Sequence, residues 1–327
     1  MNAADLAAVA EPSVFFIGEV ALDEYFTAAR WPGIADKAYI EPRTSYIGGM
    51  IANAACVYAG LGGQPELISL LGGSQLSHDL CGALEARGVS TQHMLHEPGQ
   101  PDPRNLIVLV GGDHVVLTVD VGRRPMRLGE AAVVALMQPG FLYTTLNRAR
   151  RLHAGPLTGP ALFEAFRRCG RQVLFDLDVE GFGDDDLDFL HGAAALILNR
   201  AGFQRSFGDV APEAVFGWMA RTKVGLVVRT LAAEGAEIYD GQQVITRPAI
   251  PVPVVDVTGA GDAFGGALVF GLARGWSIET AFDVAMAAAA RAITVEGPQG
   301  GVCSLATLRD FAAGYGHELP LERICRA

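Results

Sequence analysis

Short, continuous apolar runs recur along the chain, and stretches with helical spacing of apolar residues separate most of them. Parallel strands covered on both faces have this pattern, because neither face meets water. The runs predict strands at 13–20, 65–72, 141–146, 172–178, 195–199 and 224–230, and a hairpin over 234–248 that turns at Asp240–Gly241. Helices are predicted over 50–59 and from the second strand up to Gly88. This alternation predicts an α/β fold with a mostly parallel sheet and helices on both faces.

Two stretches, 23–46 and 105–121, do not fit the alternation. The first is polar and irregular, while NLIVLVGGDHVVLTVD predicts a β-hairpin with its turn at Gly111–Gly112. We interpret both as an antiparallel flap, or lid, added to the sheet. The chain has no internal repeat and no linker-like tract, so we expect a single domain over 1–327.

The stretch VVDVTGAGDAFGGALVFGLARG, residues 254–275, contains the most informative transition. An apolar run ends at Val254–Val255, Thr258–Gly261 predicts a glycine turn, and helical spacing begins at Ala263. A turn that leads into a helix leaves backbone N–H groups unpaired, which makes an anion site. The carboxylate of Asp262, at the end of this turn, would repel a bound anion. Its place is explained if it deprotonates a hydroxyl while the amides hold the phosphate that the hydroxyl attacks.

The residues around Asp262 are compatible with a purely structural role too, because aspartate is a common N-cap residue. A dinucleotide-binding motif fits less well, because these glycines lie late in the chain and Asp262 would face the pyrophosphate. The glycine–lysine pattern of a P-loop is absent, since neither Lys37 nor Lys223 follows a glycine. The lysine and His-Arg-Asp motifs of protein kinases are absent as well.

Composition argues against several kinds of binding partner. A formal net charge of -11 argues against a nucleic-acid surface, which needs clustered Lys and Arg. The five cysteines have no metal-ligand spacing and are expected to be reduced thiols of a cytoplasmic protein. No signal peptide is visible, and Asp283 and Arg291 interrupt the longest apolar helix, so no membrane span is predicted.

Glycine and polar residues in the N-terminal half predict a ligand site. Gly48 and Gly49 would let backbone amides approach a ligand, and Asn53 in the following helix offers a donor and an acceptor. Asp23 follows the first predicted strand, at the edge where ligands of open α/β sheets bind. Its carboxylate can accept hydrogen bonds from two vicinal hydroxyls, which suits a polyol. Each of these residues has a structural alternative. Gly48 and Gly49 would then form only a tight turn, Asn53 would be a helix surface residue, and Asp23 would be a solvated loop residue.

Together these motifs resemble the ribokinase-like (PfkB) family of small-molecule kinases. Residues 256–262, DVTGAGD, match the family's C-terminal signature. YIGGMIANAACVYAGLGGQPELISLLGG matches its N-terminal signature except at Ile51, where the family usually has Gly, Ala or Pro. The resemblance covers residues 15–304. It implies a three-layer α/β/α core with a small flap, and ATP-dependent phosphorylation of a primary hydroxyl of a sugar or sugar acid.

The resemblance also assigns roles to residues. Asp262 would be the general base, and the turn of Gly259, Ala260 and Gly261 would form the anion hole for the transferred phosphoryl group. The substrate would be held by Asp23, Gly48, Gly49 and Asn53, and the nucleotide by Asn199, Thr230 and Gly235. ATP and Mg²⁺ are the expected cofactors. Relatives often bind a monovalent cation such as K⁺, for which Asp256 and Thr258 occupy the matching positions.

The chain departs from the family at the expected metal site. ILNRAGF keeps the Asn199 of an Asn-x-x-Glu motif but has Gly202 in place of the Glu. We therefore expect a raised requirement for Mg²⁺, and we expect Gly202→Glu to lower it. The acidic run at 184–186 is interpreted as a solvated helix start rather than a replacement metal site.

Two further segments depart from the family pattern. FDLDVEG keeps Asp176 of an Asp-x-Asn-x-Arg motif but has Asp178 and Glu180 at the other two positions. TLAAEG has Ala232 where the nucleotide loop usually has its first glycine. These changes predict weak turnover.

An apolar flap hairpin would leave an exposed edge unless it were paired, so a homodimer through the flap is expected. A nucleoside kinase of the same family is the first alternative. Trp31, Tyr39, Tyr46 and Phe26 would then form a slot for a base, although they would equally serve to pack the flap. A weakly active or non-catalytic sugar-binding regulatory protein is the second alternative.

Overall fold

The computed structural model describes residues 12–111, 113–119 and 124–321. Gly112 of the predicted turn, Cys325 and the N-terminal stretch 1–11 lie outside the described residues. The strands are β1 Ser13–Ile17, β2 Ala21–Ala28, β3 Ile40–Gly48, β4 Pro65–Ile68, β5 Leu70–Leu71, β6 Leu95–His96, β7 Arg104–Val110, β8 Asp113–Thr118, β9 Met126–Arg127, β10 Gly140–Thr145, β11 Leu152–Ala154, β12 Leu157–Thr158, β13 Arg171–Asp178, β14 Ala195–Asn199, β15 Leu226–Thr230, β16 Ala236–Tyr239 and β17 Val244–Arg247. The helices are α1 Met50–Gly60, α2 Gln75–Glu85, α3 Glu130–Leu136, α4 Leu146–Ala149, α5 Gly159–Arg168, α6 Leu187–Leu190, α7 Arg200–Phe207, α8 Pro212–Thr222, α9 Ala260–Ala273, α10 Ile278–Ala292 and α11 Leu305–Gly314, with 3-10 turns η1 Asp184–Asp186 and η2 Ala232–Glu234.

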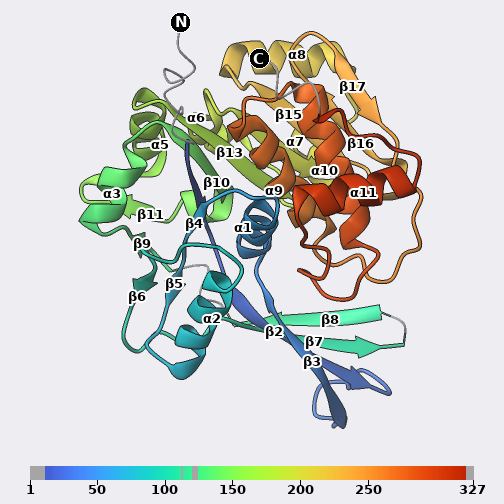
Figure 1. Cartoon of the computed structure of the whole chain (residues 1–327). Coiled ribbons are helices and arrows are strands. Elements are labelled where there is room, and N and C mark those ends of the chain that lie inside the picture. Colours follow the sequence, from blue (N-terminus) through green and yellow to red (C-terminus); the bar gives the residue numbers. More distant parts are fainter. Residues whose placement is uncertain (1–11, 112, 120–123, 322–327) are drawn as a thin grey trace, which may run out of the picture.

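The main sheet runs through the body of the molecule (Figure 1). Among the described residues it has eight strands in the order β17-β16-β15-β14-β13-β10-β1-β4. The neighbouring pairs from β4 to β15 are parallel, and β16 and β17 are added antiparallel. The α/β fold with a mostly parallel sheet is confirmed, together with the hairpin predicted over 234–248.

Neighbouring residues of the parallel strands face different helical layers. On β1, Phe16 belongs to the hydrophobic cluster that includes α1, α9 and α10, whereas Phe15 belongs to the cluster that includes α5 and α6. Both phenylalanines are buried. Successive side chains of a strand point to opposite faces, so a continuously apolar strand needs helices on both sides. The continuous runs in the sequence therefore account for the three-layer core.

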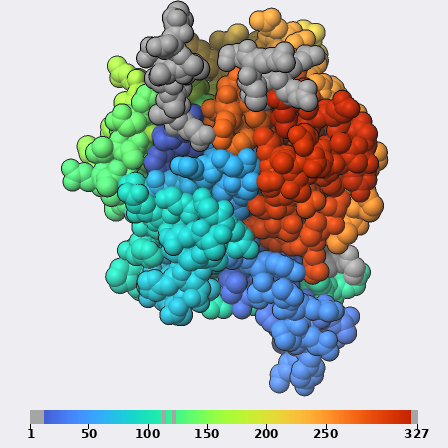
Figure 2. Space-filling model, viewed as in Figure 1, coloured from blue at the N-terminus to red at the C-terminus, as the bar shows by residue number. Residues whose placement is uncertain are grey.

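A second sheet of four strands within the described residues, in the order β3-β2-β7-β8, forms the flap. Its strand β2 follows β1 directly, and the flap projects from the body at the bottom of Figures 1 and 2. The β2–β3 and β7–β8 pairs are antiparallel, as predicted, but β2 and β7 pair in parallel. The stretch 23–46, predicted to be irregular, instead contains most of β2 and β3.

Three further local predictions are wrong. Val254 and Val255 do not end a strand but lie in a loop, where each is 62% exposed, because no neighbouring strand pairs with them within the described residues. Helix α9 begins at Ala260 rather than at Ala263, so the predicted turn forms its first residues. The strand predicted over 65–72 is divided into β4 and β5, and β5 pairs with β6 outside the main sheet.

Two findings concern cysteines and membrane-spanning helices in the described part of the chain. The cysteines there are free: Cys56, Cys81, Cys169 and Cys303. No described helix has both the length and the apolar character needed to cross a bilayer.

Candidate active site

The N-terminus of α9 is left open by its own sequence. Gly259 precedes the helix with a φ of 80°, a left-handed conformation that favours glycine. A Cβ there would also overlap the carbonyl oxygen of Pro298. No side chain of the described residues caps this helix, whereas Ser277 and Ser304 cap α10 and α11. The N–H of Ala260 donates to the carbonyl of Val257 at 3.4 Å, whereas the N–H groups of Gly261 and Asp262 in the first turn are placed to bind an anion.

Asp262 lies in that first turn and contacts α1. Asn53 donates a hydrogen bond of 2.7 Å from Nδ2 to Asp262 Oδ2. The two helices approach closely because Gly266, one turn further along α9, has no side chain, and a Cβ there would overlap the backbone of Ala54. Gly266, a small residue of the motif, therefore allows Asp262 and Asn53 to lie close together. The sequence predicts Asp262 as the base and Asn53 as a substrate contact.

Burial raises the pKa of Asp262 from 3.8 to about 7. The hydrogen bond from Asn53 lowers this pKa, while the charges of Asp176, Asp178 and Asp23 raise it further. A carboxylate with a pKa near neutrality is a stronger base than an ordinary aspartate, and a large fraction of it is still ionised at pH 7. Asp262 thus has the basicity that a general base needs.

A second buried carboxyl group lies on β13, next to α9. Asp176 accepts a hydrogen bond of 2.5 Å from the hydroxyl of Tyr143 on β10, and burial raises the pKa of Asp176 to about 6. Tyr143 packs against α9 at Gly265, where a Cβ would overlap the hydroxyl. Burial raises the pKa of Tyr143 well above 10, so its hydroxyl stays protonated and donates. The sequence did not indicate Tyr143, because it lies within an apolar strand.

Asp23 lies inside β2 of the flap, rather than in a loop after β1 as the sequence suggested. It is buried, and the lack of a side chain at Gly48 leaves room for its carboxylate. Asn105, its partner in the parallel register of β7, donates a hydrogen bond of 2.7 Å to Asp23 Oδ1. Burial raises the pKa of Asp23, and the bond from Asn105 lowers it. Gly49 precedes α1 and packs against the carbonyl of Glu19.

The sequence contained signals for two residues that were not predicted. Asn105 is a polar residue at the start of the apolar run NLIVLV. Tyr25 lies two positions after Asp23 and so shares its face of the strand. Burial raises the pKa of Tyr25, and an interaction of its hydroxyl with the side chain of Thr258 lowers it. The flap thus contacts the loop before α9 through a tyrosine on the same face as Asp23.

Asp256 organises the loop before α9. Its Oδ1 accepts a hydrogen bond from the N–H of Thr258 and its Oδ2 accepts one from Gly297, each at 2.9 Å. Burial raises the pKa of Asp256, but these two N–H groups outweigh burial and hold it below its ordinary value. Asp256 is therefore a structural anion of the loop, and the monovalent cation expected beside it and Thr258 stays a prediction.

Asn199 and Gly202 lie at the start of α7. Asn199 Oδ1 caps the helix by accepting the Gly202 N–H at 2.9 Å, and its Nδ2 donates to Asp178 Oδ1 at 2.8 Å. Asp178 has a φ of 41° at an irregularity in the β13–β14 pairing. Its carbonyl oxygen occupies the place that a Cβ of Gly202 would need. Gly202 is thus required by close backbone contact. This contact argues against a glutamate at position 202 rebuilding a metal site, and the effect of Gly202→Glu on the Mg²⁺ requirement stays a prediction.

Thr230 and Gly235 enclose the short turn η2 after β15. Ala232 begins η2 with a φ of 53°, within the left-handed region that favours glycine. Gly235 ends it with a φ of 102°. The substitution of alanine for the usual glycine has therefore left a glycine-like backbone conformation at the predicted nucleotide loop.

Three further carboxylates are engaged in ion pairs: Asp186 with Arg150, Glu19 with Arg148, and Glu24 with Arg104. Asp184 and Asp185 are exposed, as expected for a solvated helix start, but Asp186 is buried. No group of three or more His, Cys, Asp or Glu side chains in the described part of the chain could hold a metal ion.

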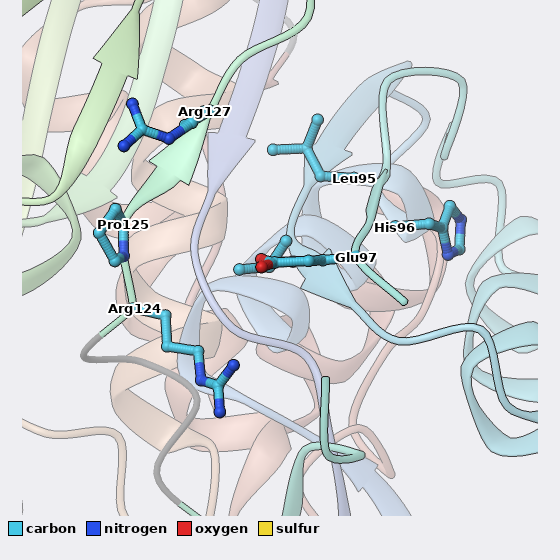
Figure 3. Close-up of a pocket in the computed structure, with 7 residues that line it drawn as sticks. Leu95, His96, Glu97, Arg124, Pro125 and Arg127 are labelled. Atoms are coloured by element: carbon cyan, nitrogen blue, oxygen red, sulfur yellow. The ribbon is translucent and has the colours of Figure 1, made fainter. Parts of the chain in front are cut away.

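A cavity of about 610 Å³ is lined by none of these site residues (Figure 3). Its lining residues are Leu70, Leu95, His96, Glu97, Arg124, Pro125 and Arg127. Figure 3 shows Leu95 and Glu97 pointing toward the segment that carries Arg124 and Pro125, while His96 points away. His96 instead contacts the carbonyl of Gly72 through Nδ1 at 2.9 Å. This cavity is therefore separate from the predicted site residues.

Comparisons with known proteins relate most of the chain to small-molecule kinases. The model of the pfkB family carbohydrate kinases matches residues 12–304. The chain is 25% identical over 314 residues to a nucleoside kinase of Methanothermobacter thermautotrophicus, covering 93% of this chain and 97% of that protein. It is 25% identical over 306 residues to a 2-dehydro-3-deoxygluconokinase of Thermoproteus tenax, covering 88% and 91%. Its fold matches the structure of Arabidopsis thaliana ribokinase complexed with ribose and ATP, with a TM-score of 0.78 at 20% identity over 92% of this chain and 98% of the other.

Proposed function

The chain belongs to the pfkB family of carbohydrate kinases, and we propose that it transfers the terminal phosphoryl group of ATP to a primary hydroxyl of a sugar or sugar acid. The observation that carries this proposal is the presence of Asp262, with its raised pKa, in the uncapped first turn of α9. A base and an anion site in one helical turn suit the attack of a hydroxyl on a phosphoryl group. We include in the proposal a single domain over 1–327 and a cytoplasmic location.

In the proposed mechanism, Asp262 accepts the proton of the substrate hydroxyl while the hydroxyl oxygen attacks phosphorus. The bond between phosphorus and the bridging oxygen breaks, and ADP leaves with the electron pair. The N–H groups from Gly259 to Asp262 donate to the oxygens of the transferred group, where negative charge develops. Because base and donors share one turn of α9, helix geometry fixes the distance between them.

Mg²⁺, when bound, would neutralise the charge of the ATP phosphates. Such sites commonly use one or two protein carboxylates together with phosphate and water oxygens. Asp178 fits this requirement, because its exposed carboxylate at the carboxyl end of β13 is oriented by Asn199. We propose that Asp178 holds the metal in place of the glutamate that is absent at position 202, with Thr230 and Gly235 beside the nucleotide.

Asp23 and the amides of Gly48 and Gly49 are the proposed substrate contacts. Asn105 engages one oxygen of the Asp23 carboxylate, which leaves further acceptor positions for vicinal hydroxyls. Asp23, Gly48 and Asn105 lie in the flap strands β2, β3 and β7, respectively. The flap therefore carries the groups proposed to bind the polyol.

Asp23→Ala is expected to weaken the apparent affinity for the sugar about ten- to a hundredfold, because a hydrogen bond to a charged group contributes about 1.5–3 kcal/mol. The KM for ATP is expected to stay near its wild-type value. Glu24→Ala is the matched control, since the adjacent side chain points to the other face of β2 and pairs with Arg104. Steady-state kinetics in both substrates measure these changes. Equal losses for sugar and ATP would assign Asp23 to the fold instead.

A homodimer through the flap is part of the proposal. Val116 and Leu117 point to opposite faces of β8 and are 47% and 49% exposed, and Tyr39 near the start of β3 is 94% exposed. Apolar side chains on both faces of a projecting sheet with an open edge favour association with another chain. A second copy presents the same surface, which allows a symmetric contact.

Light scattering is expected to report twice the chain mass of 34.5 kDa. Tyr39→Asp is expected to shift the protein toward a single chain, because a charge replaces apolar contact area in the flap. Val134→Asp changes a residue on α3 that is 61% exposed and should leave the mass unchanged. A monomeric wild type, or a Tyr39→Asp variant that is still a dimer, would contradict the proposal that the flap is the interface.

Release of ADP with panels of sugars, sugar acids and nucleosides, with and without Mg²⁺, tests the proposed function directly. A nucleoside kinase is supported by the relative from Methanothermobacter and by the edge contact of Tyr25 with Tyr46, whose ring centroids are 5.6 Å apart. Trp31 and Tyr39, expected to line a base slot, are instead 47% and 94% exposed. Release of ADP with nucleosides but not with sugars or sugar acids would favour the nucleoside kinase. Sugar binding without any release of ADP would favour the regulatory protein.

A further inference from the structure

Gln299 belongs to a short loop, residues 297–299, that touches several parts of the site. The backbone of this loop donates a hydrogen bond to Asp256 and packs against Gly259. The side chain of Gln299 reaches α1, where its Nε2 donates a hydrogen bond of 2.9 Å to Asn53 Oδ1. One loop therefore contacts the segment before α9, the start of α9, and the helix that carries Asn53.

The contact with Asn53 sets the orientation of the Gln299 amide. Its other end, Oε1, is buried and has no hydrogen-bond partner among the described residues. An unpaired buried acceptor costs free energy, so the bond from Nε2 is what favours this arrangement. In the reverse orientation, Gln299 Oε1 would face Asn53 Oδ1, and two acceptors would meet without a hydrogen between them.

The same bond decides which end of Asn53 faces Asp262. An asparagine amide has a donor end and an acceptor end. Because Gln299 engages Oδ1, Nδ2 is left to donate to Asp262 Oδ2 at 2.7 Å. A rotated Asn53 would place its Oδ1 against the Asp262 carboxylate and repel it.

We propose that Gln299 is a positioning residue of the phosphoryl-transfer site, which acts through Asn53 to keep a hydrogen-bond donor on the Asp262 carboxylate. This inference rests on the proposed role of Asp262 as the base. The other titratable groups that interact electrostatically with Asp262 are Asp176 and Asp178 from β13, Asp23 from β2 and Tyr143 from β10. The three aspartates disfavour an ionised Asp262, whereas the donor from Asn53 favours it.

Gln299→Leu is expected to lower kcat about tenfold and to move the acidic limb of the pH profile of kcat/KM upward by about one pH unit, as for loss of a hydrogen bond to a charged group. Activity should recover as the pH is raised. The KM for the sugar should change little. Gln242→Leu, at an exposed position of the β16–β17 turn, is the control and should leave the pH profile unchanged.

A double-mutant cycle separates this role from a general structural one. If Gln299 acts through Asn53, the Asn53→Ala variant should lose nothing more when Gln299→Leu is added. Additive losses, or a pH profile that does not move in Gln299→Leu, would overturn the proposal.

A ¹³C NMR titration of the Asp262 carboxyl carbon, assigned by its loss in Asp262→Asn, needs no turnover. A higher Asp262 pKa in Gln299→Leu than in the wild type supports the proposal, and an equal pKa overturns it. If the wild type releases no ADP with any panel substrate, the proposed function fails, while this titration still decides the role of Gln299.

Discussion

Replacing Asp262 by Asn is expected to lower the rate of phosphoryl transfer by about 10²–10⁴-fold, the range typical for loss of a general base. The amide has the shape of the carboxylate, and its oxygen still accepts the hydrogen bond that Asn53 donates to Asp262 in the wild type. It cannot take the proton of the attacking hydroxyl. Rapid-quench or steady-state ADP release measures the loss, and calorimetry is expected to show that sugar binding is retained.

The stability of the same variant distinguishes a lost base from a lost fold. The pKa of Asp262 is about 7 in the folded protein, above the ordinary value of 3.8 that applies after unfolding. A carboxyl group with a raised pKa costs the folded state stability, and this cost grows as the pH rises from the unfolded toward the folded pKa. At pH 7 and above, Asp262→Asn should therefore melt at the wild-type temperature or higher. Near-wild-type turnover would rule out Asp262 as the base, and an inactive, unstable variant would point to a structural role.

Gly202→Glu is expected to lower the free energy of unfolding by about 2–4 kcal/mol rather than to restore a magnesium site. Its Cβ would overlap the carbonyl oxygen of Asp178. That carbonyl belongs to a residue with a φ of 41°, whose side chain is also tied to Asn199, so the strand end cannot move away without losing these contacts. Gly202→Ala should be destabilising for the same reason, because the Cβ alone makes the clash. Urea unfolding measures both variants.

Gly82→Glu is the matched control for this prediction. Gly82 lies within α2, and its Cβ position has no heavy atom within 4 Å. A side chain there should be neutral or slightly stabilising, because glycine weakens a helix interior by about 1 kcal/mol. A Gly202→Glu protein that folds with wild-type stability and needs less Mg²⁺ would restore the expectation drawn from the sequence.

The hydrophobic pattern by itself determined the layers of the core. Phe15 and Phe16 are adjacent apolar residues of one strand, and a strand apolar at consecutive positions must be covered on both faces. The glycine turn before Asp262 likewise follows from local chemistry, since Gly259 has a backbone conformation that glycine favours. Each of these features involves residues close together in the chain, where the order of amino acids is enough.

Local sequence patterns were insufficient to predict strands whose pairing partners lie elsewhere in the chain. Val254 and Val255 have the composition of a strand but no neighbouring strand within the described residues, so they form an exposed loop. Asp23 was expected in a loop, yet it lies in a flap strand because β7 and β3 pair with that segment. Strand formation depends on such partners as much as on propensity.

The chemical environment of Asp262 was decided by tertiary structure alone. Asn53 is 209 positions away from Asp262, and Gln299 is 246 positions away from Asn53, yet the three side chains form one hydrogen-bonded series. The close approach of α9 to α1 at Gly266 creates the first of these contacts. The pKa of Asp262 results from burial and from carboxylates on other strands. Burial and distances between distant segments arise only when the chain is packed, so the motif predicted the base, and the fold set its basicity.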